Sequence, residues 1–166
     1  MCAYRQRRYI KMLENTEEYT AVASGPLVDS GLMCNFVANK NSYEDEEKYE
    51  AMKAFMKVYF KTLDWMAENT EEVVQYCVDM NDENGSSMEP EIVEKYVQAD
   101  KYYTLDEAVQ MMETKAEGSE YSEMESNLMD VLDFFISVGN YMEGDDEKFA
   151  GHVDSTLLKE VLDESK

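Results

Sequence analysis

The sequence predicts a helix-dominated α/β fold in which residues 1–166 form a single domain. From residue 45 onward, apolar side chains recur at the three- and four-residue spacing of amphipathic helices. Ahead of them, the stretches YTAVASG (19–25) and LMCNFVAN (32–39) are rich in β-branched, aromatic and small residues and flank a turn-like PLVDSG. These two stretches predict short strands, and 166 residues is the length of one domain.

The first long helix is expected over residues 46–67, after a polar connector over 39–47. Its inward positions are Met52, Phe55, Met56, Tyr59, Leu63 and Met66. Asn69 and Glu72 have the spacing of a capping box, in which the Asn69 side chain accepts from the new helix. A second helix is therefore expected to begin as soon as the first ends at Glu68. Its inward residues are Val73, Val74, Cys77 and Met80.

Similar local signals mark the starts of the later helices. Pro90 suits the first turn of a helix, because its missing N–H has no partner there. Its apolar residues are Ile92, Val93, Tyr96 and Val97. Thr104 and Glu107 form another capping box. A longer helix is expected over 123–142, with Leu128, Leu132, Phe135, Ile136 and Val138 as its apolar residues. Asp154 or Ser155 caps a final helix that carries Leu157, Leu158, Val161 and Leu162.

Acidic residues dominate the chain, with 37 Asp and Glu against 15 Lys and Arg and a net charge of −22. Such a surface repels nucleic acid and anionic lipid headgroups, so we expect no nucleic-acid partner. All three arginines lie in the first eight residues, where a short helix is expected over 4–15. This basic tip is an anchoring arm, or else an exposed helix start or a frayed terminus. No apolar run reaches the roughly 18 residues that a membrane-spanning helix needs.

The sequence contains no motif that indicates catalysis, a metal or a cofactor. Its one histidine, His152, lies in a polar loop, and no G-x-S-x-G nucleophile elbow accompanies it. Cys2, Cys34 and Cys77 show no CxxC spacing. In the acidic loop 79–91, neither possible register of an EF-hand places the glycine and the ligands correctly. We therefore expect no enzyme, no metal site and no cofactor.

One ordered series of short motifs is more specific than the apolar spacing that any amphipathic helix shows. It runs through CNFVANKNSYEDEEKYEAMKAFMKVYFKTLDWMAENTEEVVQYC and PEIVEKYVQADKYYTLDEAVQMM, and ends with LDFFISVGNYMEGD and DSTLLKEVL. Over roughly residues 19–163, this series resembles the C-terminal part of ABC-importer substrate-binding proteins of the taurine, sulfonate, nitrate and thiamine-precursor type. The resemblance implies a periplasmic-binding-protein-like (type II) partial domain with few short strands, whose first lobe is absent from this chain.

The resemblance also implies a function and a site. The chain is expected to be a solute-binding component, or a fragment of one, that delivers a small organic molecule to an ABC permease without catalysing a reaction. Such proteins act outside the cytoplasm, and no export signal is found in this chain. The resemblance implies that Met33, Cys34 and Asn35 line the ligand cleft. The alternative is that they are ordinary residues of a hinge strand. The ligand is of the aminopyrimidine, taurine or sulfonate class, and the lack of arginine after Arg8 favours a neutral or cationic one.

A second function class follows from the residues alone. The charge of −22 and the thirteen methionines suit an acidic helical interaction protein, or adaptor, that binds a basic partner. The sequence also predicts self-association. If the strand at 32–38 lacks its neighbours, its open edge pairs with that of a second copy, giving a homodimer through residues 19–39.

Overall fold

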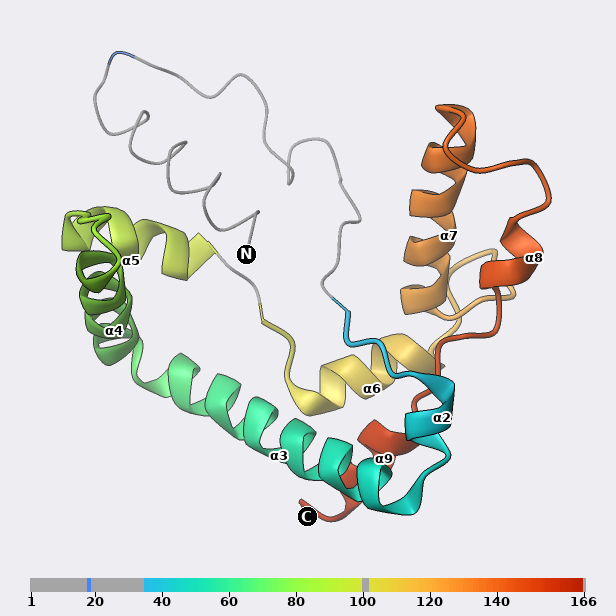
Figure 1. The fold of residues 1–166 in the computed structure, drawn as a ribbon, viewed down its shortest axis with the longest axis horizontal. Helices are drawn as coiled ribbons and strands as arrows, with labels where there is room; N and C mark the ends of the chain where they lie inside the picture. The colour runs from blue at the N-terminus through green and yellow to red at the C-terminus, as the bar shows by residue number, and fades with distance from the viewer. Residues whose placement is uncertain (1–17, 19–34, 100–101, 166) are drawn as a thin grey trace. The chain divides into compact units, whose positions relative to one another are not determined.

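The computed structural model describes residue 18, residues 35–99 and residues 102–165, and Figure 1 shows their arrangement into helices. The helices are α2 (Lys40–Tyr43), α3 (Glu46–Glu68), α4 (Thr70–Glu83), α5 (Pro90–Ala99), α6 (Leu105–Glu113), α7 (Glu123–Ser137), α8 (Asp146–Phe149) and α9 (Thr156–Asp163). None of these helices is long and apolar enough to cross a membrane.

The predicted α/β class is wrong for this part of the chain, which contains no sheet. Its only β-type pairing is an isolated antiparallel bridge between Lys115 and Ser122. Residues 35–39, the described end of the predicted strand 32–39, have no regular secondary structure, and their Phe36 and Val37 side chains are exposed. Asn39 instead caps α2 by accepting the N–H of Asn41 at 3.0 Å.

The physical reason is that β-propensity alone does not make a strand. A strand is stabilised by a neighbour that takes up its backbone N–H and C=O groups. No such neighbour pairs with residues 35–39 among the described residues, and the other predicted strand, 19–25, lies outside them. The expected periplasmic-binding-protein-like (type II) architecture therefore does not fit the helical structure.

The chain divides into two compact units. That the two units form a single domain, as the chain length predicts, stays a prediction. The described part of the first unit comprises residue 18, residues 62–99 and residue 102. Here α4 packs on α5, and the core residues Met88, Ile92 and Val93 are buried. The partly buried residues packed against them are Val74, Cys77, Val78 and Val97. As predicted, α5 begins at Pro90.

The joint between α3 and α4 lies where the sequence predicts it, but its mechanism is different. α3 ends at Glu68 and α4 begins at Thr70. The side chain of Asn69 makes no cap bond to α4 and instead donates from Nδ2 to the carbonyl of Trp65 at 2.7 Å. Carbonyls at a helix end lack partners just as N–H groups at a helix start do. The amide of Asn69 thus closes the end of α3.

The described part of the second unit comprises residues 35–61 and 103–165. In it, α6 packs on both α7 and α9, and α7 contacts α8. The buried apolar residues are Phe60, Val109, Met129, Leu132, Leu157 and Val161. The predicted capping box of α6 is confirmed, because Thr104 Oγ1 accepts the Glu107 N–H at 3.2 Å and Glu107 Oε2 accepts the Thr104 N–H at 2.9 Å.

α7 is shorter than the predicted helix over 123–142. It begins after Ser122, whose side chain accepts the N–H of Glu125 at 3.2 Å, and it ends at Ser137. Gly139 follows with φ 77°, a left-handed conformation that glycine adopts without steric cost and that commonly terminates helices. The apolar residues after Ser137 therefore lie in a turn and not on a helix face.

Candidate interaction surface

The residues predicted to bind a ligand do not form a site that the structure shows. Asn35 is exposed, and Met33 and Cys34 lie outside the described residues. A pocket of about 250 Å³ lies between α6 and α7, lined by Met111, Ala116, Glu117, Glu123, Ser126, Asn127 and Asp130. This volume is below the roughly 300–1,000 Å³ of typical small-molecule sites. In the parts of the chain that can be searched, no group of His, Cys, Asp and Glu has the arrangement of a metal site.

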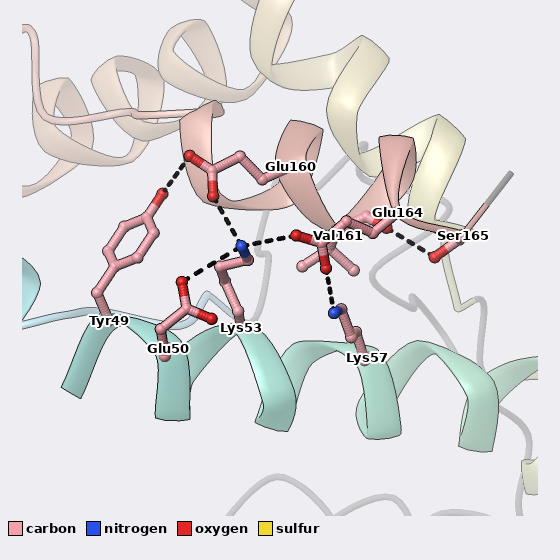
Figure 2. A network of polar contacts seen from close by, with 8 residues as sticks. All are labelled: Tyr49, Glu50, Lys53, Lys57, Glu160, Val161, Glu164 and Ser165. Atoms are coloured by element: carbon pink, nitrogen blue, oxygen red, sulfur yellow. Dashed lines mark hydrogen bonds and ion pairs between the residues drawn. The ribbon is translucent and has the colours of Figure 1, made fainter. Parts of the chain in front are cut away.

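A buried lysine forms the centre of an ionic network between α3 and α9 (Figure 2). Lys53 of α3 is only 6% exposed. Its Nζ lies 2.8 Å from Glu164 Oε1, 3.0 Å from Glu160 Oε2 and 3.4 Å from Glu50 Oε1. Lys57 pairs with the other carboxylate oxygen of Glu164. This network, which we call the Lys53 clamp, joins residues more than a hundred positions apart in the chain.

The polar atoms of the Lys53 clamp are occupied by one another. The Tyr49 hydroxyl donates to Glu160 Oε1 at 3.2 Å, beside the lysine (Figure 2). Hydrogen bonds from Lys53 and then Lys57 lower the pKa of Glu164 to about 2, and hydrogen bonds to Glu164 and Glu160 raise the pKa of Lys53. Opposite charges that fix one another in their ionised forms are typical of a structural contact. The clamp therefore holds α9 on α3.

An exposed apolar surface gathers at the end of α7 and in the turn that leads to α8. Its members, which we call the α7–α8 patch, are Phe134, Phe135, Val138, Tyr141, Met142 and Phe149. Their rings contact one another edge-on, with centroids 5.7 Å apart for Phe134 and Phe135, 6.1 Å for Phe135 and Tyr141, and 5.4 Å for Tyr141 and Phe149. These contacts join the four aromatic side chains of the patch into one cluster.

Hydrogen bonds fix the turn that presents the patch. The N–H of Asn140 donates to the carbonyl of Phe135 at 2.9 Å. Asp145 is buried, accepts the N–H of Met142 at 2.9 Å and lies 2.5 Å from Lys148 Nζ. The bonds from Lys148 and then Met142 lower the pKa of Asp145. The carboxylate thus holds the turn in shape, while the Met142 side chain stays 73% exposed.

The segment that carries the patch is rich in exposed negative charge. Besides the buried Asp145, residues 130–149 contain one lysine, Lys148, and five exposed carboxylates: Asp130, Asp133, Glu143, Asp146 and Glu147. That lysine is paired with Asp145. The surface therefore combines an aromatic centre with an anionic rim, the arrangement of an interface with a hydrophobic core and a polar border.

Sequence reasoning named Phe135 and Val138 only as apolar residues of a helix over 123–142 and so missed this surface. Two signals in the sequence pointed to it. The adjacent side chains of Phe134 and Phe135 leave a helix about 100° apart, so the two rings point in different directions. The Gly139–Asn140 dipeptide favours a helix end and a turn.

No family model, curated protein or solved structure matches the chain. The resemblance to importer substrate-binding proteins is therefore not tested by these comparisons and stays a prediction. The functional argument depends on the surface that the structure itself presents.

Proposed function

We propose that this protein is an acidic helical interaction protein that binds a basic, amphipathic segment of a partner at the α7–α8 patch. The observation that carries the proposal is the set of exposed aromatic side chains in ring contact, on a segment that also carries five exposed carboxylates. Monomeric proteins rarely leave such contiguous apolar surface uncovered unless it has a binding role. The partner, in this proposal, supplies apolar anchors for the centre and lysine or arginine for the rim.

Each part of the surface contributes differently to binding. Burial of aromatic side chains at the centre supplies most of the affinity, because a few aromatic anchors dominate typical interfaces. The faces of Phe134 and Tyr141 also attract a guanidinium or ammonium group placed over them. The carboxylate rim raises the association rate and selects against acidic partners. Met142 adapts its unbranched side chain to the shape of the bound segment.

The solute-uptake role predicted from the resemblance stays a prediction that nothing here tests. That role presumes an α/β fold, which is not the fold of the described residues.

The test uses a synthetic amphipathic peptide of about 18 residues, five helical turns, with lysine and arginine on one face and leucine and tryptophan on the other. Binding to the full-length chain is measured by fluorescence anisotropy, beside a scrambled peptide of the same composition. We expect the amphipathic peptide to bind and the scrambled peptide to bind much more weakly. Equal binding of the two would show that charge alone attracts them, and would overturn the proposed site.

Variants locate the binding surface. We expect Phe134→Ala and Met142→Ala each to weaken peptide binding by roughly five- to thirtyfold, the range of interface hot spots. The matched control is Tyr76→Ala, because Tyr76 on α4 is 63% exposed and Phe134 is 60% exposed. Affinity should also fall between about 50 mM and 500 mM NaCl, since salt screens the rim. If the control weakens binding as much as Phe134→Ala does, the α7–α8 patch is not the site.

A further inference from the structure

A second exposed surface lies along α3, on the side of the helix away from the Lys53 clamp. Its positions repeat at alternating steps of four and three residues, which is the spacing of a helix-pairing seam. We call these five exposed residues the α3 seam: Glu47, Ala51, Ala54, Val58 and Lys61. Phe55 borders the seam and is 53% exposed. Its ring lies edge-on to Phe36, with centroids 5.5 Å apart, and is stacked with Tyr59 at 6.3 Å.

The α3 seam is complementary to itself. When a second α3 runs antiparallel with Ala54 opposite Ala54, each Ala51 lies opposite Val58 of the other copy. At the ends of the seam, each Glu47 then lies opposite Lys61 of the other copy, so two opposite-charge pairs form by symmetry. The alanines at the centre allow the helices to approach closely, and Phe55 lies where the second helix covers it.

The charge of this region singles it out on an acidic protein. The α3 seam carries one glutamate, Glu47, and one lysine, Lys61, so its own charges balance in a chain whose net charge is −22. The other lysines of the same stretch are paired with carboxylates outside it. Two copies of so acidic a chain repel each other over most of their surfaces. The α3 seam is a place where two copies can approach without that repulsion.

We propose that two copies of this chain pair antiparallel along the α3 seam in a symmetric dimer. The two-fold axis passes beside Ala54, and the surface is the same on both copies, as a two-fold interface requires. This dimer differs from the one that the sequence predicts through residues 19–39, most of which lie outside the described residues. It is also independent of the α7–α8 patch.

Sedimentation equilibrium of the full-length chain tests the proposal, over concentrations from about 1 μM to 100 μM that bracket a micromolar dissociation constant. We expect a dimer that dissociates on dilution. Ala54→Glu places two like charges at the two-fold axis and should raise the dissociation constant tenfold or more. The matched control is Ala67→Glu, an exposed alanine of the same helix that lies off the seam, and it should leave the constant nearly unchanged.

Charge reversal tests the antiparallel register. Glu47→Lys and Lys61→Glu should each weaken the dimer, and the two changes in one chain should restore it, because residue 47 faces residue 61 of the other copy. Circular dichroism checks that each variant keeps its helices. A monomer at all concentrations overturns the proposal. Equal effects of Ala54→Glu and Ala67→Glu, or no rescue by the double reversal, also overturn it.

Discussion

Replacing valine by alanine at three positions tests whether the two cores are packed as the structure shows. Val93 in the α4–α5 core and Val161 in α9 are both 0% exposed, and Val37 is 93% exposed. The same two methyl groups are lost at each position. At the buried positions this removes about 1.6 kcal/mol of transfer free energy, at about 0.8 kcal/mol per carbon. The cavity left behind adds up to about 1 kcal/mol, so we expect a loss of about 2 kcal/mol at Val93 and at Val161.

At Val37 the same change removes almost no buried surface, so the expected effect is within about 0.5 kcal/mol of zero. Urea denaturation followed by circular dichroism measures the free energy of unfolding, and a thermal scan should show the buried variants about 4–8 °C lower. Because Val93 and Val161 belong to different units, each variant reports on its own core. If Val37→Ala costs as much as Val93→Ala, or if either buried variant is neutral, the burial described here is incorrect.

Two further predictions concern a helix cap and the Lys53 clamp. Thr104→Ala removes the capping box of α6 and should lower the free energy of unfolding, measured by urea titration, by about 1 kcal/mol. The control is Thr114→Ala at the other end of α6, where the cap bond comes from the backbone, and it should change the free energy of unfolding little. The pKa of Glu164 is lowered from its ordinary value of 4.5 to about 2, so its stabilisation is complete above about pH 4.5 and is lost as the pH falls toward 2. Glu164→Gln should therefore lower the melting temperature near pH 6 but not near pH 2. The exposed control Glu120→Gln should leave the dependence of the melting temperature on pH unchanged. If Glu164→Gln lowered the melting temperature equally at all pH values, the ionised Glu164 carboxylate would not be what stabilises the clamp.

Local signals predicted the helix starts well, whereas the predicted end of α7 was wrong. The start of α3 at Glu46, the joint at Asn69 and the first turn at Pro90 depend on residues within a few positions of one another. Caps, proline and apolar spacing act at that range. Even so, the partner of the Asn69 side chain was wrong, because an amide both donates and accepts and the sequence does not say which end it serves.

Features that need a distant partner were predicted poorly. The strand at 32–39 needed a neighbouring strand, and its described part has none. Phe55 and Met80 have the spacing of inward residues, yet both are exposed, because a helix buries only the part of its apolar stripe that another element covers. The predicted ligand residues came from a resemblance and not from any chemistry of Met33, Cys34 and Asn35. The α7–α8 patch escaped notice because it depends on where α7 ends.

The distribution of the few lysines explains why the two proposed surfaces differ. Lys53, Lys57 and Lys159 hold α9 in place through Glu160, Glu164 and Glu113. Lys148 is held by Asp145, so the carboxylate rim of the α7–α8 patch has no other lysine in residues 130–149 to neutralise it. A partner must supply that positive charge. The α3 seam carries both Glu47 and Lys61, charges that complement those of a second copy. A dimer paired there presents two patches, and a partner with two basic segments would bind it by avidity as well as by contact.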